Sequence, residues 1–366
     1  MRHTIICIAF ILISLSVIAQ DNFISKDIPN EYDYHLAYHS HGYTYTDAYL
    51  AQFDLTSKDH TDALQEVLNT HPKVILPNHS IYINKTGISL RNNSLLIGQK
   101  DTQLIMLPND EIDSAVIKIE NVEHVTIKGL RIVGDRDTRI HPIVGEWGHG
   151  VVIRNCSDIL LDGLKIEKTI GDGVYIGQLD DLASKNIYVK NTVIDQVMRN
   201  GVSITSGRNI MLYNLFIANT HGTNPMCGID IEPNSNRDFI ENIFIVNTIT
   251  YNNKVGGLKI NINKLGKGQT KKEVSIFVNH FKDYYSETGF ISSNITVSPE
   301  NFYGIIELSD LKFYYNNTPF NFKSSLAQHL KIKIRGIDWE HQYRKAFTKK
   351  RTLKVLKKRN DLKLIE

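Results

Sequence analysis

The segment between residues 115 and 262 repeats one short pattern of apolar and turn-forming positions. Each copy is a glycine, then Val, Ile or Leu, then a variable residue, then Ile. Apolar residues at alternate positions are typical of a β-strand with one buried face, and glycine suits a tight bend. The five copies begin at Gly150, Gly173, Gly201, Gly228 and Gly257.

A second pattern follows each of the first four copies, and an earlier copy of it begins at His124. It is an apolar stretch between two turn-prone residues five positions apart. The second turn residue precedes the next glycine by 10 residues in three repeats, and by 21 or 14 in the others. The constant spacing indicates scaffold, and the variable spacing indicates loops. Asn186, Asn209 and Asn242 occupy equivalent turns, which predicts a ladder of stacked side chains.

These spacings favour a stack of coils, each made of short strands joined by turns. One coil cannot bury its own apolar face, whereas stacked coils share a continuous core and pair their backbone groups with their neighbours. A β-sandwich of evenly spaced hairpins is the alternative, but it does not explain the constant five-residue spacing. The sequence therefore predicts an all-β chain, folded as a single-stranded right-handed parallel β-helix (a solenoid) with a short N-terminal capping helix.

The segment before the repeats predicts that cap. Residues 59–70 form a short amphipathic pattern with Asp59 or Thr61 as the N-cap. A cap is needed because an open coil end exposes unpaired strand edges. The buried face of this helix is predicted to hold Ala63, Leu64, Val67 and Leu68.

We predict a β-helix domain over residues 55–340, with regular coils at 115–262 and an irregular register after Lys264. Further strands are expected near residues 274–281, 294–297, 304–313 and 330–334.

The first 19 residues predict a signal peptide that is cleaved near Ala19. Arg2 precedes an apolar run at residues 5–18, and small residues follow it. At 14 residues the run is too short to cross a bilayer, although an uncleaved membrane anchor is the alternative. We expect a secreted protein, periplasmic or extracellular, with an N-terminal extension at residues 20–54. No later stretch is apolar enough to be a transmembrane segment.

The net charge of +3 comes from 42 basic and 39 acidic residues, so composition does not indicate a nucleic-acid partner. We expect a monomer. The basic tail at residues 341–366 is interpreted as a solvated end or helical cap, in preference to a patch for an anionic polymer. After signal cleavage only Cys156 and Cys227 remain. The repeat places them three coils apart, roughly 14 Å at ~4.8 Å per coil. A disulfide tolerates a Cα separation of about 7 Å, so we predict two free buried thiols.

At this point the residues resemble the pectin lyase-like superfamily of β-helix proteins. The opening DALQEVLNTHPKVILPNHSIYI resembles its capping helix and first strand, and the run GDGVYIG, RNGVSIT and CGIDIEPN resembles right-handed β-helix repeat proteins of secreting bacteria. The resemblance covers residues 55–265. It implies the fold more firmly than the reaction, because this superfamily includes polygalacturonases, pectate lyases, alginate epimerases and phage tailspikes.

Counted from the repeated glycine, the first and third following residues point inward, and the second and fourth point outward. Because coils lie ~4.8 Å apart, the outward columns and the column before the glycine form one polar strip. The loops at residues 135–147 and 221–226 lead into this strip and would wall a groove. The second-position column holds Val152, Tyr175, Ser203, Asp230 and Lys259. The fourth-position column holds Arg154, Gly177, Thr205, Glu232 and Asn261. The column before the glycine holds His149, Asp172, Asn200, Cys227 and Gly256.

Asp230 and Glu232 lie two positions apart on one strand and point outward together. Such a pair either raises one pKa to make a general acid or shares a cation. Lys259 stands beside Asp230 in the next coil, and a structural Asp–Lys pair is the alternative.

The resemblance implies further roles. Asp172 lies in the column where polygalacturonases keep catalytic carboxylates, His149 in the column of their catalytic histidine, and Lys259 where their substrate-binding arginine lies. The sequence departs from that pattern: it has no Asn-Thr-Asp motif and no adjacent Asp pair, and His149 lies one coil before Asp172. A turn-forming role for Asp172 is the alternative.

The predicted catalytic residues are Asp172, Asp230, Glu232 and Lys259. The predicted substrate-binding residues are His149, Tyr175, Arg199, Asn200, His221, Trp147 and Asn261, with Glu146 as a further candidate. Arg199 would neutralise a uronate, and Trp147 or Tyr175 would stack on a sugar face. No cofactor is required, although Ca²⁺ on Asp230 and Glu232 would serve a lyase.

Two classes of function remain. The first is an enzyme that cleaves an extracellular polysaccharide. As a hydrolase it would use two of the three acids as acid and base. As a lyase it would use Lys259 or Arg199 to abstract the C5 proton while a cation neutralises the uronate. Three acids without a dense aspartate cluster favour the hydrolase over a lyase or epimerase. The second class is a non-catalytic glycan-binding or surface module.

Overall fold

The computed structural model describes residues 47–54, 56–141, 146–292, 301–322, 330–340, 354, 357 and 362–365. The predicted signal peptide, most of the 20–54 extension and the predicted strand at 294–297 lie outside the described residues, as does most of the 341–366 tail.

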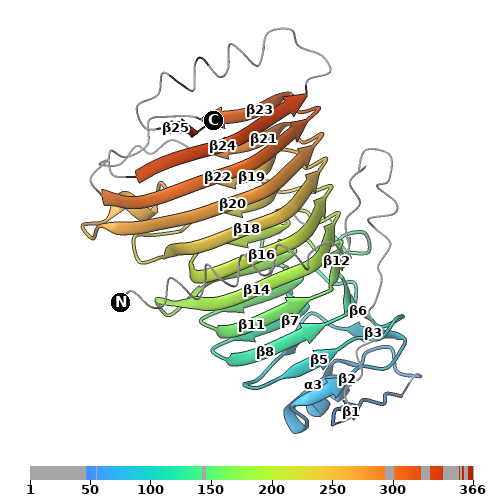
Figure 1. Cartoon of the computed structure of the whole chain (residues 1–366). Helices are drawn as coiled ribbons and strands as arrows, with labels where there is room; N and C mark the ends of the chain where they lie inside the picture. Colours follow the sequence, from blue (N-terminus) through green and yellow to red (C-terminus); the bar gives the residue numbers. More distant parts are fainter. Residues whose placement is uncertain are drawn as a thin grey trace. The chain divides into compact units, whose positions relative to one another are not determined.

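Each coil of the structure carries strands on three faces, and successive coils lie one above another (Figure 1). The face of short strands, called the short-strand face below, contains β4 (Ile88–Ser89), β7 (Ile117–Glu120), β10 (Val151–Arg154), β13 (Val174–Leu179), β15 (Val202–Ile204), β17 (Cys227–Ile231), β19 (Gly256–Ile260), β21 (Thr288–Ser292) and β23 (Thr318–Phe322).

On the other two faces, the early coils use separate strands and the later coils use long bent ones. The separate strands are β1 (Tyr49–Leu50), β2 (Lys73–Ile75), β3 (Ser80–Ile83), β5 (Leu95–Ile97), β6 (Gln103–Met106), β8 (Glu123–Lys128), β9 (Arg131–Val133), β11 (Ser157–Asp162) and β12 (Lys165–Glu167). The later strands are β14 (Leu182–Asp195), β16 (Gly207–Ala218), β18 (Ile240–Tyr251), β20 (Lys272–Tyr284), β22 (Phe302–Tyr314), β24 (Leu330–Glu340) and the short β25 (Leu362–Ile365). The helical elements with described bounds are α3 (Thr61–Thr70) and the 3₁₀ turn η2 (Leu265–Lys267).

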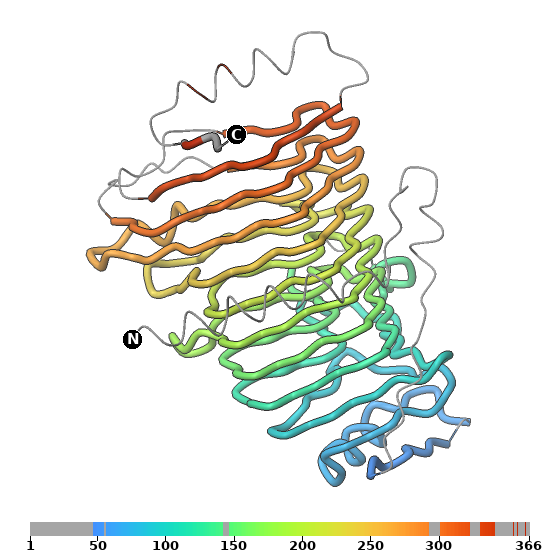
Figure 2. Tube along the Cα trace, viewed as in Figure 1, coloured from blue at the N-terminus to red at the C-terminus, as the bar shows by residue number. Residues whose placement is uncertain are grey.

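Parallel pairing between consecutive coils confirms the predicted β-helix. On the short-strand face, Val151 pairs with Val174, Val174 with Val202, and Val202 with Ile229. All four of these side chains are fully buried, so the first position after the glycine points inward as predicted. The path of the chain climbs coil by coil from the blue first coils to the red last ones (Figure 2).

The asparagine ladder is confirmed. The Asn209 side-chain amide donates to Asn186 Oδ1 at 3.0 Å, and the Asn242 amide donates to Asn209 Oδ1 at 3.0 Å. All three residues have φ of 55–56°, in the left-handed region that asparagine tolerates better than other side chains. A second ladder, which the sequence analysis did not predict, runs through Asn191, Asn214 and Asn247.

The regular stack is longer than the predicted 115–262. Toward the N-terminus, β4 pairs with β7 and β7 with β10. Toward the C-terminus, Leu258 of β19 pairs with Phe290 of β21, and β20 pairs with β22 without a register shift. The stack therefore continues past Lys264, and the irregular register expected there is limited, among the described strands, to one shift in the β18–β20 pairing between Ile240 and Ile243. What changes there is side-chain volume: Phe290 and Phe320 continue the inward column of the short-strand face that Ile229 and Leu258 occupy in earlier coils, which hides the repeat.

The capping helix is present, but its details differ from the prediction. It begins at Thr61, and its N-cap is His60, whose carbonyl accepts the Leu64 N–H at 2.9 Å. Asp59 instead accepts the Thr61 N–H at 2.9 Å from outside the helix. Leu64 and Leu68 are buried, Val67 is half-buried and Ala63 is exposed.

Two further predictions are tested by the described residues. Cys156 and Cys227 are both free and buried, as expected. Within the described part of the chain, no helix has the length and apolar character needed to cross a membrane.

Substitution of Asn209 tests the ladder. Asn209→Ala should lower the free energy of unfolding by about 2 kcal/mol, because a left-handed backbone strains alanine and two amide hydrogen bonds are lost. Asn209→Gly loses the same hydrogen bonds without the strain, so it should cost about 1 kcal/mol less. Urea unfolding followed by circular dichroism measures both. Equal losses in the two variants would show that the ladder position carries no backbone strain.

Candidate active site

The pairing register brings the predicted polar strip together on the outer side of the short-strand face. Tyr175 pairs with Ser203, Ser203 with Asp230, and Asp230 with Lys259. These side chains point away from the core, yet Asp230 is only 2% exposed and Tyr175 only 6%. The strip is therefore a largely desolvated row of polar groups, where electrostatic interactions are stronger than at an open surface.

An acid pair lies in the fourth of the five coils of the strip. Lys259 Nζ is 2.8 Å from Glu232 Oε2 and 3.4 Å from Asp230 Oδ2. The Asn261 amide donates to Glu232 Oε1 at 2.7 Å, and the Asn200 amide donates to Asp230 Oδ2 at 3.4 Å. The structure thus brings together Asp230, Glu232, Lys259 and Asn261, which were all predicted site residues. Asn200, from the preceding coil, joins this cluster through Asp230.

The surroundings shift the pKa values of the two carboxyl groups of this pair in opposite directions. Burial raises the pKa of Asp230 to about 7; the Lys259 charge opposes this shift and the Glu232 charge adds to it. Burial would also raise the pKa of Glu232, but the charge and hydrogen bond of Lys259 lower it below its ordinary value. Near neutral pH, Asp230 is therefore poised to hold a proton while Glu232 is ionised, which is the pattern of an acid and a base side by side.

Asp172 is tied to this pair through Arg199. Arg199 Nη1 lies 3.1 and 2.9 Å from the two Asp172 oxygens and 3.4 Å from Ser203 Oγ. Burial raises the pKa of Asp172, and the Arg199 charge works against that shift. Burial would lower the pKa of Arg199, but the charges of Asp172, Asp230 and Glu146 raise it. Arg199 therefore stays cationic between Asp172 and Asp230.

The column before the glycine forms a ladder of its own. His149 Nδ1 accepts the Asp172 N–H, Asp172 Oδ1 accepts the Asn200 N–H, and Asn200 Oδ1 accepts the Cys227 N–H, each at 2.9 Å. Each side chain thus satisfies the backbone donor at the same position in the next coil. Sequence reasoning missed this role, whose signal is the run of acceptors one residue before each repeated glycine.

The ladder fixes the state of His149. Since Nδ1 accepts a hydrogen bond, the ring proton resides on Nε2. Burial lowers the pKa of His149 well below its ordinary value, so the ring is neutral. It stacks on Tyr175 with ring centroids 4.9 Å apart, and the Tyr175 hydroxyl lies 2.9 Å from Thr205 Oγ1.

Three buried polar atoms in the strip have no hydrogen-bond partner among the described residues: His149 Nε2, Arg199 Nε and Asp230 Oδ1. Most buried polar groups in proteins are hydrogen-bonded, so orphaned ones call for a ligand, water or a chemical role. Their concentration in one row of four coils marks the strip as the candidate site.

Other predicted residues lie further out. Trp147 is 41% exposed and has its ring edge toward His149, at 6.3 Å between centroids. Glu146 is exposed in the same loop. His221 is exposed in the second loop, and no described contact joins its side chain to the strip.

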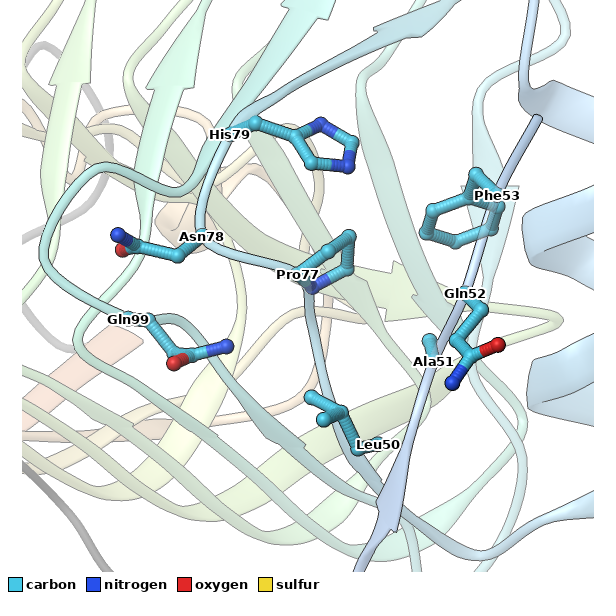
Figure 3. Close-up of a pocket in the computed structure, with 8 residues that line it drawn as sticks. All are labelled: Leu50, Ala51, Gln52, Phe53, Pro77, Asn78, His79 and Gln99. Atoms are coloured by element: carbon cyan, nitrogen blue, oxygen red, sulfur yellow. The ribbon is translucent and has the colours of Figure 1, made fainter. Parts of the chain in front are cut away.

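The described surface includes at least two hollows. One, of about 300 Å³, lies at the early end of the strip beside Trp147 and Arg154. The other, of about 280 Å³, lies between residues 50–53 on one side and residues 77–79 with Gln99 on the other (Figure 3). It shares no residue with the strip. Among the described residues, no group of three or more His, Cys, Asp or Glu side chains is arranged to hold a metal ion.

The stacked parallel coils and their outward polar row define a right-handed parallel β-helix fold, which solved structures of low sequence identity share. No protein-family profile matches the chain. The uncharacterized protein YclG of Bacillus subtilis is 28% identical over 160 residues, which span 40% of this chain and only 27% of that protein.

Solved structures share the fold at low identity. The A-module of mannuronan C-5 epimerase AlgE4 from Azotobacter vinelandii has a TM-score of 0.50 and 11% identity, covering 78% of this chain and 85% of that one. The N-terminal fragment of bacteriophage Phi29 gene product 12 has a TM-score of 0.51 and 11% identity, covering 77% and 55%.

Two substitutions of Asp172 distinguish the contribution of its charge from that of its hydrogen bond to the Asn200 N–H. Asp172→Ala should lower the free energy of unfolding by about 3 kcal/mol, because it leaves the buried Asn200 N–H and Arg199 without their partner. Asp172→Asn keeps an acceptor oxygen for the Asn200 N–H, so its loss of unfolding free energy should be clearly smaller. Urea unfolding compares the two variants. If both lose the same stability, the ladder bond contributes nothing.

The raised pKa of Asp230 predicts a pH dependence of stability. A carboxyl group with a folded pKa of about 7 and an ordinary value of 3.8 takes up a proton on folding between these two pH values. Its contribution to stability is therefore present at low pH and is lost as pH rises to 7. The free energy of unfolding, measured as a function of pH over this window, should differ in slope between the wild type and Asp230→Asn by up to about 1.4 kcal/mol per pH unit. Parallel slopes would contradict the raised pKa.

Proposed function

We propose that the protein is a carbohydrate-active enzyme that cleaves an extracellular polysaccharide by hydrolysis. The observation that carries this proposal is the acid pair, in which the buried Asp230 has one unpartnered oxygen and a pKa raised to about 7, beside Glu232, whose pKa is lowered by Lys259. Glycoside hydrolysis needs such a division of roles between two carboxyl groups. The AlgE4 neighbour acts on mannuronan by its name, which supports a glycan as the substrate class.

In the proposed reaction, Asp230 gives its proton to the glycosidic oxygen as the bond to the anomeric carbon breaks. A carboxylate, Glu232 or Asp172, accepts a proton from the water that attacks the same carbon. Lys259 acts on Glu232 by keeping it ionised, and Arg199 holds Asp172. Asn200, His149, Tyr175, His221, Trp147 and Asn261 are proposed to contact the sugar chain.

The same electrostatics disfavour the lyase alternative. Burial would lower the pKa of Lys259, but the charges of Asp230 and Glu232 raise it above its ordinary value. Arg199 is held cationic in the same way. A base that abstracts the C5 proton must be unprotonated, so neither group suits elimination or epimerisation as well as the carboxyl groups suit hydrolysis.

A second candidate function is glycan binding without catalysis. The observation that favours it is the ladder through His149, Asp172 and Asn200, which gives three predicted site residues a structural role. We further propose that the protein is secreted, works as a monomer and requires no cofactor for hydrolysis.

Activity assays with an acid-pair variant test the proposal. The wild type is incubated with a panel of plant, algal and host polysaccharides; new reducing ends report hydrolysis, and ultraviolet absorbance of unsaturated sugars reports elimination. Asp230→Asn should reduce the rate of hydrolysis by about 10²–10⁴-fold, the usual contribution of a general acid.

Asp283→Asn is the matched control. Asp283 is also fully buried, and burial raises its pKa to about 7, but its partners are Thr250, Ser286 and Asn316 outside the strip. This variant should keep full activity once folded. No cleavage of any polysaccharide, together with retention on a glycan column, would favour the binding module. Activity that survives Asp230→Asn would refute the assignment of the acid.

A further inference from the structure

The hollow at the early end of the strip is the starting point. It measures about 300 Å³, which is the lower end of the range for ligand pockets and suits a single small ring. Trp147, Ile112 and Val152 supply its apolar wall. The first two are exposed, at 41% and 48%. An exposed tryptophan flanked by polar side chains suits a sugar ring. The apolar C–H face of the sugar packs on the indole, and the hydroxyls at its edge bind the polar side chains.

Charged groups of both signs complete the lining. Arg154 forms an ion pair with Glu120 at 3.3 Å and has its guanidinium 5.1 Å from the Tyr175 ring centre. Lys118 lines the same hollow, and its ammonium has no ion pair within the described part of the chain. Asp113 supplies a further carboxylate. Since donors and acceptors are mixed, the lining suits hydroxyl groups, which both donate and accept, better than a single ion.

Register places this hollow in line with the acid pair. Val152 pairs with Tyr175, Tyr175 with Ser203, and Ser203 with Asp230, so Val152 and Asp230 share one outward column. They lie three coils apart, roughly 14 Å at ~4.8 Å per coil. The side chains between them, Ser203 and the Tyr175–Thr205 pair, are polar or aromatic.

We propose that this hollow is a distal sugar subsite, in which Trp147 stacks on a pyranose ring and Lys118 and Arg154 bind its hydroxyls. The inference rests on the proposed function of the strip as a glycan groove. It adds that a bound chain crosses at least three coils, from the acid pair to Trp147. The protein therefore selects oligosaccharides long enough to reach both places, and a short fragment at the acid pair binds without the contribution of the subsite.

Tryptophan fluorescence gives a direct readout, because the chain has only two tryptophans. Trp339 is 8% exposed and lies in β24, away from the strip. In a Trp339→Phe, Asp230→Asn protein, Trp147 is the remaining reporter and the substrate is not consumed. The probes are size-fractionated fragments of each polysaccharide in the panel, made by partial acid hydrolysis. Long fragments should shield Trp147 from acrylamide, whereas the shortest should not.

Affinity as a function of fragment length completes the test. Calorimetric titration of Asp230→Asn should show at least a tenfold gain in affinity once fragments become long enough to span the three coils. Trp147→Ala and Lys118→Ala, each made in the Asp230→Asn background, should remove most of that gain. Lys331→Ala, an exposed lysine of β24, is the matched control and should keep the gain.

The outcomes separate the two proposals. Shielding of Trp147 together with unimpaired cleavage by Asp230→Asn would leave the subsite standing and refute the acid. Loss of cleavage in Asp230→Asn, with a length dependence that survives Trp147→Ala and Lys118→Ala, would refute the subsite alone. If no fragment of any length shields Trp147, the subsite is likewise overturned.

Discussion

Parallel backbone pairing from one coil to the next is the constraint on which the rest of this molecule depends. Each strand of the short-strand face between β4 and β23 pairs with the strand one coil before and the strand one coil after, and the shared register repeats through β10, β13, β15 and β17. A side chain therefore has a neighbour of the same column about 4.8 Å away on either side. The asparagine ladders, the ladder before the glycines and the inward apolar rows are all columns of this kind.

The columns serve structure and chemistry with the same residues. The asparagine ladders lie at the bends, where the backbone is left-handed, and their side-chain amides hydrogen-bond from coil to coil. The ladder through His149, Asp172 and Asn200 supplies acceptors to backbone donors of the next coil, and it also fixes a neutral imidazole and a carboxylate bound to Arg199. Polar groups in such columns are held by hydrogen bonds to the neighbouring coils, so their orientation is set by the fold.

Desolvation gives the acid pair its distinct character. Asp230 and Glu232 differ little in type and are separated by one residue, yet burial and the position of Lys259 move their pKa values in opposite directions. The cationic groups nearby are in turn held protonated by the same carboxylates. The proposed division into acid and base is thus a property of the whole cluster, which assembles only when three coils are stacked.

The amino-acid sequence by itself determined the coil, because the repeated glycines, the inward Val, Ile and Leu, and the turn asparagines recur at fixed spacing. It also placed Asp230 beside Lys259 and kept Cys156 and Cys227 apart, since a shared register converts spacing into position. It did not reveal that the stack continues through β21 and β23, because phenylalanines there occupy the inward column that Val, Ile and Leu occupy in earlier coils, while the parallel pairing continues. Nor did it give His60 as the helix cap, the ladder before the glycines, or the hollow beside Trp147. Those features, and the protonation of the acid pair, depend on burial and on contacts between residues more than 20 positions apart, which only the stacked coils bring about.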